Sequence, residues 1–170
     1  TPLEKMGVPS AVVTLLWGAI VKEKLAAAME RLMQLAQAFQ AESNDAAAET
    51  LLNAALGLFP SNIKLLEQTA ASHEREKRFE RAAFFWNRCG KLREEAGELP
   101  LARSCFEKSI DLDSNQPDFY ISLLSVYHQL QATDDIKKLG TTLLPILRKV
   151  GNIQTLVDVC KQLVIMVPDM

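Results

Sequence analysis

The sequence of 170 residues has few of the features that nucleic-acid-binding proteins need. Aromatic residues make up only 6% of it, which is too few for an array of platforms on which bases could stack. The formal net charge is −2, so no overall positive field attracts nucleic acid or an anionic membrane surface. We therefore expect no nucleic-acid partner.

Long apolar runs are also missing. No stretch reaches the roughly 18 consecutive apolar residues that a membrane-spanning helix needs. Residues 8–21 are apolar, but Lys22, Glu23 and Lys24 follow them before any small-residue cleavage site, which argues against a signal peptide. We expect this segment to be part of the folded protein. The chain begins at Thr1 rather than at methionine, which is compatible with a fragment of a longer protein.

Cysteine and histidine are scarce and scattered. Cys89, Cys105 and Cys160 form no CxxC pair, and we expect them to be reduced, buried thiols in a cytoplasmic protein. His73 occupies a core-type position and should be packed, whereas His128 lies on a polar helix face and should meet solvent or contact a partner. This distribution predicts no metal site and no cofactor.

Catalytic motifs are absent as well. The sequence contains no GxSxG, Walker A, GxGxxG or HExxH motif. Glu94 and Glu95 are adjacent and would diverge on a helix, which makes them a poor general acid and base pair. We therefore expect this chain not to be an enzyme.

The sequence does contain apolar residues spaced three and four apart along nearly its whole length, with no sustained alternation, which predicts an all-α protein. Residues 10–39 could form one long helix or two with a bend near residues 21–24. Pro145 should kink or restart the helix in which it lies. The other expected helices are 45–58, 63–75, 80–95, one with Ala102 and Phe106, one with Tyr120 and Tyr127, one beginning at Thr133, and one ending before Pro168.

The stretch 83–114 has a recognisable order of residues. Trp86 and Gly90 lie on a first helix, Gly97 at a bend, and Ala102 and Phe106 on a second helix. This order resembles a tetratricopeptide repeat (TPR), in which an aromatic, a small residue, a turn and A-x3-F follow one another over about 34 residues. The resemblance covers residues 29–170 and implies a right-handed α–α superhelix of about eight or nine helices, with Trp86 and Phe106 among the packing residues.

The repeats do not follow one register. Residues 29–62 form a full unit, closed by Pro60, and the next step of 34 residues places Ala48 over Ala82. However, Ala82 and Ala102 are only twenty residues apart, so the helix near 80–95 belongs to two overlapping registers. We expect one degenerate unit there. Residues 1–28 are predicted to be a lead-in with an apolar capping or assembly helix, and residues 29–170 a TPR-like domain.

The resemblance implies a non-catalytic protein–protein interaction module that binds a peptide or a helix on the concave face of the superhelix. By the positions of the family, that face would carry Met33, Gln37, Gln40, Lys64, Glu67, Glu74, Asn87, Lys91, Glu94, Ile121, Ser125 and His128.

Two alternatives remain open at this point. The chain could be the acceptor-recognition domain of a larger bacterial enzyme, such as a glycosyltransferase or another transferase. It could instead be a scaffold that assembles into a homo-oligomer through residues 10–21, where Trp17 would be part of an exposed apolar patch unless the helix packs as a cap.

Overall fold

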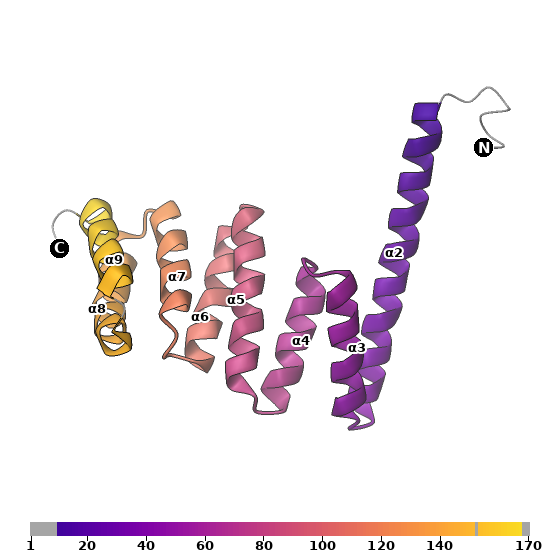
Figure 1. Cartoon of the computed structure of the whole chain (residues 1–170), viewed down its shortest axis with the longest axis horizontal. Helices are drawn as coiled ribbons and strands as arrows, with labels where there is room; N and C mark the ends of the chain where they lie inside the picture. Colours follow the sequence, from indigo (N-terminus) through magenta and orange to yellow (C-terminus); the bar gives the residue numbers. More distant parts are fainter. Residues whose placement is uncertain (1–9, 152, 168–170) are drawn as a thin grey trace. The chain divides into compact units, whose positions relative to one another are not determined.

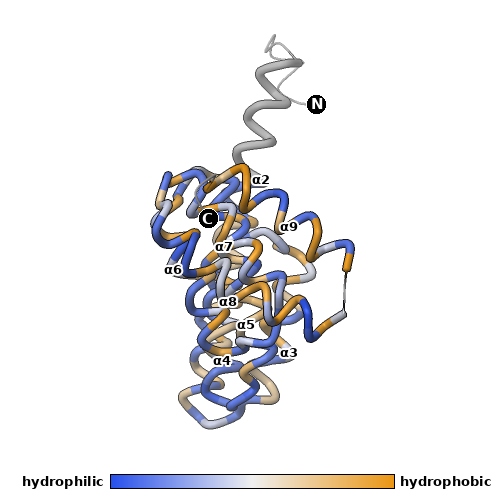
Figure 2. The backbone as a smooth tube through the Cα atoms, turned by 90° about the vertical axis from the view of Figure 1, so that its left-hand side faces the viewer, coloured by the Kyte–Doolittle hydropathy of each residue, from blue (hydrophilic) through white to orange (hydrophobic). Residues whose placement is uncertain are grey.

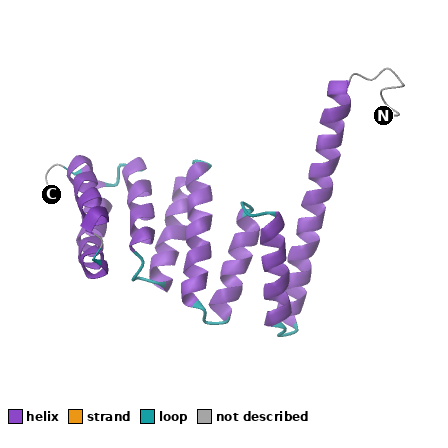
Figure 3. Cartoon of the chain, viewed as in Figure 1, coloured by secondary structure: helices purple, strands orange, loops and turns teal. Residues whose placement is uncertain are grey.

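The computed structural model describes the backbone of residues 10–151 and 153–167 and the side chains of residues 22–151 and 153–167. Figure 3 shows helices joined by short loops, and no strand occurs within these residues. The chain divides into two compact units, Thr1–Pro60 and Ser61–Met170. The all-α helical-repeat fold predicted from the sequence is confirmed.

The first unit is a pair of helices, α2 (Ser10–Ala41) and α3 (Asp45–Leu58). The Asn44 side chain caps α3 by accepting a hydrogen bond of 3.3 Å from the backbone N–H of Ala47. The sequence left open whether residues 10–39 form one long helix or two, and the structure has one long helix, α2. The expected domain boundary at residue 28 lies inside this helix. The side chains of residues 10–21, Trp17 included, lie outside the described residues. The proposed assembly patch therefore stays a prediction.

The second unit contains six helices within the described residues, which Figure 1 traces as successive antiparallel neighbours. Their bounds are α4 (Ile63–Arg75), α5 (Phe79–Glu95), α6 (Leu99–Leu112), α7 (Pro117–Gln129), α8 (Thr133–Val150) and α9 (Ile153–Met166). The predicted restart at Pro145 is wrong, because α8 continues through this residue to Val150. Pro145 is exposed, so its ring projects into solvent rather than into a neighbouring helix.

The turns reveal a longer repeat than the 34-residue one. Ser43, Gly97 and Gly151 have positive φ angles and are each 54 residues apart, as are Lys77 and Gln131. Four of these turns are closed by the same 6→1 backbone hydrogen bond that ends helices in the Schellman motif. These bonds run from Asn44 N to Phe39 O, from Arg78 N to His73 O, from Glu98 N to Arg93 O, and from Ala132 N to Tyr127 O.

Helix lengths follow the same period. The triplet α4–α6 has helices of 13, 17 and 14 residues, and the triplet α7–α9 has helices of 13, 18 and 14. The helix that belongs to two registers, α5, has an equivalent in α8. It is therefore a repeated feature of the fold rather than a single degenerate unit. The buried equivalents are Leu65 and Phe119, Leu66 and Tyr120, Thr69 and Leu123, Ala70 and Leu124, Ser72 and Val126, His73 and Tyr127, Ala82 and Ile136, Cys89 and Leu143, Cys105 and Val159, and Ser109 and Leu163.

A close approach of α5 and α6 anchors the second unit. Phe106 is fully buried, and its ring lies against Gly90 so closely that a Cβ at that position would be 2.4 Å from Cε1. Only glycine leaves room for the ring. From Phe106 one apolar core continues through Leu124 of α7 and Leu143 of α8 to Leu163 of α9. Figure 2 shows the alternation of apolar and polar stretches along these helices that this packing requires.

Several sequence predictions about single residues can be checked. His73 is buried and stacks on Phe85 with ring centroids 5.4 Å apart, and His128 is exposed, as predicted. Cys89 and Cys105 are buried, but the prediction is wrong for Cys160, which is exposed because Val159 and Leu163 take the packed side of α9. Trp86 is half-buried rather than part of the core. No helix among the described residues is both long and apolar enough to span a membrane.

Candidate functional site

The triplet α4–α6 carries a row of side chains that do not follow the packing of the core. Phe79, Trp86 and Arg93 are seven residues apart on α5, so they lie in line along one side of that helix. Side chains of α4 and α6 stand on the two sides of this row and contact it. We call this arrangement the α5 channel.

At one end of the channel, Arg93 joins α4 to the start of α6. Its Nη2 lies 2.5 Å from Oε1 of Glu67 and its Nη1 lies 2.9 Å from Oε2 of Glu98. The hydrogen bond to Glu67 is the main reason why the pKa of the Arg93 guanidinium is raised above its usual value. Two carboxylates therefore hold one half-buried cation, and the positive charge is already compensated within the channel.

In the middle of the channel, Trp86 is held from both sides. Its indole Nε1 donates a hydrogen bond of 2.5 Å to Oε1 of Glu74 on α4. The Lys108 ammonium from α6 lies 4.0 Å from the centroid of the indole ring and 2.8 Å from the same Glu74 oxygen. The cation, the ring and the carboxylate together fix the orientation of the Trp86 side chain.

Between these two clusters the surface is hollowed. A recess of about 260 Å³ is bordered by Glu67, Trp86, Arg93, Leu101, Ser104, Cys105 and Lys108. Leu101 is 50% exposed at its rim. A recess of this size can take one or two side chains of a ligand, with Trp86 and Leu101 as its apolar surface.

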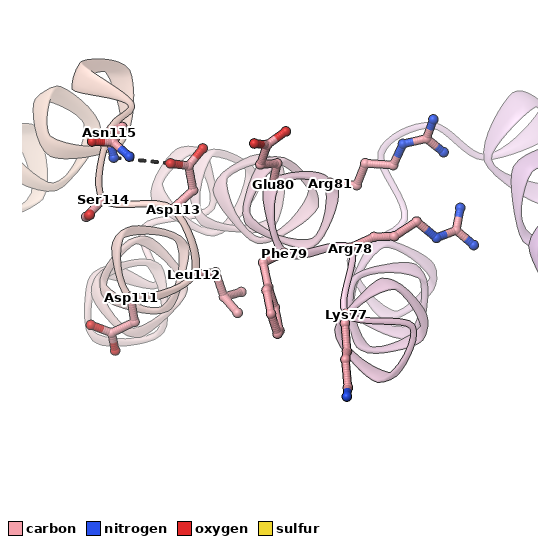
Figure 4. Close-up of a pocket in the computed structure, with 10 residues that line it drawn as sticks. All are labelled: Lys77, Arg78, Phe79, Glu80, Arg81, Asp111, Leu112, Asp113, Ser114 and Asn115. Carbon is pink, nitrogen blue, oxygen red and sulfur yellow. Dashed lines mark hydrogen bonds between the residues drawn. The ribbon is translucent and has the colours of Figure 1, made fainter.

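A second and wider recess of about 560 Å³ lies at the other end of the row, around Phe79, which is 48% exposed. Figure 4 shows Phe79 and Leu112 pointing to the same side, with Asp111 on one flank and Lys77 on the other. The loop that borders it is held by a hydrogen bond of 3.1 Å from the backbone N–H of Asn115 to Oδ1 of Asp113. The second recess thus has two apolar side chains, Phe79 and Leu112, among charged residues of both signs.

The two buried thiols next to the channel, Cys89 and Cys105, are unreactive. Burial raises the pKa of Cys89 to about 12, and it also raises the pKa of Cys105. The Cys89 Sγ lies 3.8 Å from the carbonyl oxygen of Ile63, its hydrogen-bond acceptor. Because the thiolate is the reactive form, neither group is prepared for nucleophilic chemistry at neutral pH. Within the described residues no three His, Cys, Asp or Glu side chains gather in a way that could hold a metal ion.

The residues predicted to contact a partner fall into separate groups. Glu67 and Glu74 border the α5 channel. Glu94 accepts hydrogen bonds of 2.6 Å from both Ser125 and Gln129, so it joins α5 to α7 on another side of α5. Asn87 is buried. Of the others, Gln37, Lys64, Lys91 and His128 are exposed, whereas Met33, Gln40 and Ile121 are half-buried. Their role in binding stays a prediction.

Sequence reasoning did not identify Phe79, Arg93, Leu101 or Lys108 as site residues, and it assigned Trp86 to the core. A signal was present, because the seven-residue spacing of Phe79, Trp86 and Arg93 places two aromatic rings and a cation on one side of a helix. The comparison with the equivalent positions 54 residues later, which hold Thr133, Gly140 and Leu147, would have shown that this row is not a requirement of the repeat.

No protein-family model and no curated protein matches this sequence. Among solved structures, the N-terminal domain of stress-induced protein-1 (STI-1) from C. elegans is 23% identical, with 68% of this chain and 96% of that chain covered and a TM-score of 0.42. Pseudomonas aeruginosa PilF is 16% identical over 94% of this chain and 92% of its own, with a TM-score of 0.35. TTC0263, a thermophilic TPR protein in Thermus thermophilus, is 14% identical over 83% of this chain and 92% of its own, with a TM-score of 0.32.

The character of the repeat is therefore taken from the turns and the packing of this chain. Helices joined by short turns, and a glycine beside the phenylalanine of the next helix, agree with the order of residues in the TPR pattern. The helical repeats of this chain resemble the TPR pattern. Nothing about a partner passes from the neighbours to this chain.

Proposed function

We propose that this chain is a non-catalytic protein-interaction module and that it binds an extended peptide segment of a partner protein along the α5 channel. The observation that carries the proposal is the accessible apolar surface of Phe79 and Leu101, together with the pairing of Arg93 with Glu67 and of Lys108 with Glu74. Paired charges need no ligand of opposite sign, so the free energy of binding would come from apolar side chains entering the two recesses.

The spacing of the recesses determines the kind of peptide. Phe79 and Trp86 are seven residues apart on a helix, which is about 10 Å along its axis. A peptide in the extended polyproline II conformation has three residues per turn and rises about 3.1 Å per residue, so side chains three positions apart lie on the same side, about 9 Å apart, and would reach both recesses. We propose a motif with two apolar residues separated by two others. An acidic residue beyond the apolar side chain at the Phe79 end would lie near Lys77.

The partner-binding residues predicted from the sequence enter this proposal only in part. Glu67 and Glu74 act by holding Arg93, Trp86 and Lys108 in place, whereas the peptide itself would touch Phe79, Trp86 and Leu101. The reduced state of the buried thiols Cys89 and Cys105 supports a cytoplasmic location as part of the same proposal.

A peptide-display selection against the full chain tests the proposal. Peptides with the apolar-x-x-apolar motif should be enriched, and Phe79→Asp and Leu101→Asp should each weaken their binding by at least about tenfold, which corresponds to about 1.4 kcal/mol. Both positions lie in the first turn of a helix, where an acidic residue is tolerated, so the variants should remain folded.

Leu58→Asp is the matched control, because Leu58 is 70% exposed in the first unit and lies far along the sequence from the channel residues. It should leave binding unchanged. Selected peptides that bind the two channel variants as tightly as the unchanged chain would place the binding site elsewhere.

A further inference from the structure

The cluster of Glu74, Trp86 and Lys108 has the form of an occupied cation site. The Lys108 ammonium lies 4.0 Å from the centroid of the Trp86 ring and 2.8 Å from Oε1 of Glu74. The Trp86 indole N–H donates to that same oxygen, so the ring and the carboxylate are fixed relative to each other. An aromatic face and a carboxylate are together well suited to bind a positively charged group. In this structure the group is a side chain of the chain itself.

The fold does not require this cluster. At the equivalent positions of the second triplet, 54 residues later, the chain has His128, Gly140 and Gln162, which supply no carboxylate. The second triplet nevertheless has the same turns and nearly the same helix lengths. The cation, the ring and the carboxylate are therefore not explained by the packing of the repeat.

A second cluster of the same kind shows which cation suits such a site. The Tyr127 hydroxyl donates a hydrogen bond of 3.0 Å to Oε1 of Glu107, and Nε of Arg103 lies 2.7 Å from the same oxygen. The Cζ atom of Arg103 lies 5.1 Å from the centroid of the Tyr127 ring. An aromatic donor and a cation again share one carboxylate oxygen, but here the cation is a guanidinium. A guanidinium stacks on rings and pairs with carboxylates through two parallel hydrogen bonds, which an ammonium cannot do.

Lys108 can leave its position, and a ligand can come next to it. Its side chain is 43% exposed, so solvent screens its contacts and can hydrate the ammonium once it is released. Lys108 and Trp86 both border the recess of about 260 Å³, and Leu101 is exposed at its rim. A ligand side chain in this recess therefore lies beside both the indole ring and the ammonium that now occupies the site.

We propose that Trp86 and Glu74 form a guanidinium-binding site, which Lys108 occupies until an arginine side chain of a bound peptide displaces it. The peptide is the one that binds along the α5 channel, so this part of the inference rests on the proposed function. The arginine would stand next to the apolar residue that enters the recess beside Leu101. Because one cation replaces another, Glu74 stays paired, and the exchange determines which peptides are preferred.

The indole N–H resonance of Trp86 reports occupancy of the site without any peptide. In a Trp17→Phe background it is the single indole signal of the chain, because the sequence has two tryptophans. The probe is acetyl-arginine amide at constant ionic strength, and the matched control is acetyl-citrulline amide, which has nearly the same shape but no charge. The arginine probe should shift the resonance in a saturable way, whereas the citrulline probe should not.

Variants of the resident cation give a graded expectation. Lys108→Gln vacates the site and should bind the arginine probe at least about threefold more tightly than the unchanged chain. Lys108→Arg fills the site with a guanidinium and should bind the probe at least about threefold more weakly. A lysine with only a structural role would not give opposite effects for these two changes. Glu74→Gln should abolish the shift, and Lys91→Gln, an exposed change on α5, should leave the affinity unchanged.

Peptides selected against the chain provide the second test. In an arginine-containing peptide whose binding depends on Phe79 and Leu101, replacing the arginine by citrulline should weaken binding at least about threefold. The same replacement should have no effect on binding to the Glu74→Gln chain, because the carboxylate that prefers the charged side chain is gone.

Either of two results would overturn the inference. The indole resonance could respond alike to the arginine and citrulline probes, or the arginine probe could bind the Lys108→Gln and Lys108→Arg chains equally well. Alternatively, peptides could bind through Phe79 and Leu101 with the same affinity whether they carry arginine or citrulline, which would leave the α5 channel as a peptide site without a guanidinium subsite. If the probe results hold and no peptide depends on Phe79 and Leu101, the proposed function fails while the guanidinium site is supported.

Discussion

The triplets α4–α6 and α7–α9 have the same turns and nearly the same helix lengths, yet different side chains fill equivalent places. The ion pair of Glu67 and Arg93 stands where the second triplet has Ile121 and Leu147, which pack in its apolar core. A backbone repeat needs buried contacts, turns and close approaches, and the second triplet meets these needs without charges. The polar row in the first triplet is therefore an addition to the fold rather than a part of it.

The two triplets also differ on the outer side of their third helix, and here the second triplet is the one with unusual residues. In the first triplet, the α7-facing side of α6 carries Arg103 and Glu107 at its edge, and both have partners. In the second, the same side of α9 is apolar and exposed at Val157 and Val164. Residues 54 positions apart have the same backbone setting, so each can be compared with the other. Where the two side chains differ in kind, the backbone fold does not explain the difference.

The largest expected effect contrasts two equivalent positions, Phe106 and Cys160. Phe106→Ala should lower the free energy of unfolding of the second unit by about 3–5 kcal/mol, because it removes a fully buried ring. Cys160→Ala should change it by less than about 0.5 kcal/mol, since the side chain is exposed. Urea denaturation followed by Trp86 fluorescence in a Trp17→Phe background measures both. If Cys160→Ala lowered the free energy of unfolding as much as Phe106→Ala does, the Cys160 side of α9 would have to be buried in the isolated chain.

The next effect concerns the close approach of α5 and α6. Gly90→Ala should cost about 1–3 kcal/mol, because its Cβ would overlap the Phe106 ring, which is enclosed by the core. Gly57→Ala is the control, since no atom lies within 4 Å of a Cβ there and the change should stabilise α3 by up to about 1 kcal/mol. Adding Phe106→Leu to Gly90→Ala should recover part of the loss. A neutral Gly90→Ala would show that the ring can move aside.

Much of this fold is predictable from the sequence, and for physical reasons. Apolar spacing of three and four, the cap Asn62 and Gly97 at a turn are local signals, and the helix bounds derived from them agree closely with the structure. The turn at residues 43–45 is also a signal, although the cap of α3 is Asn44 rather than the Asp45 that the sequence suggests. The 54-residue period was harder to see. Two of its left-handed turn positions are held by Lys77 and Gln131, which have no sequence signature for positive φ.

The site is less predictable because it depends on which helices lie side by side. Glu67 and Glu74 are deduced from the TPR-like register, but Arg93 and Lys108 belong to other registers, and only the packing of α4, α5 and α6 brings them together. The assignment of Trp86 to the core fails for a related reason. Its place in the pattern predicts burial, yet the charged neighbours hold it at the edge of a recess.

A smaller change in stability should follow when the ion pair of Glu67 and Arg93 is replaced by the apolar residues of the second triplet. Arg93→Leu alone should cost about 1–2 kcal/mol, because it leaves the half-buried Glu67 without its cation. The double change Glu67→Ile with Arg93→Leu imports the residues of the second triplet and should return stability to within about 0.5 kcal/mol of the original. Denaturation of both variants checks this. A double variant as unstable as the single one would show that the ion pair is required by the fold.

The smallest effect distinguishes the two triplets at Lys108, whose equivalent is Gln162. Lys108→Gln removes the contact with the Trp86 ring and the ion pair with Glu74, but the Lys108 side chain is 43% exposed, so solvent screens both and the loss should be about 0.5–1 kcal/mol. The loss should shrink in about 0.5 M NaCl, and Trp86 fluorescence should shift as the ring gains freedom. Lys91→Gln, an exposed change on α5, should alter neither stability nor fluorescence. If the two variants behave alike, Lys108 does not hold Trp86 in the channel, and peptide binding there would have to rely on Glu74 alone to orient the indole.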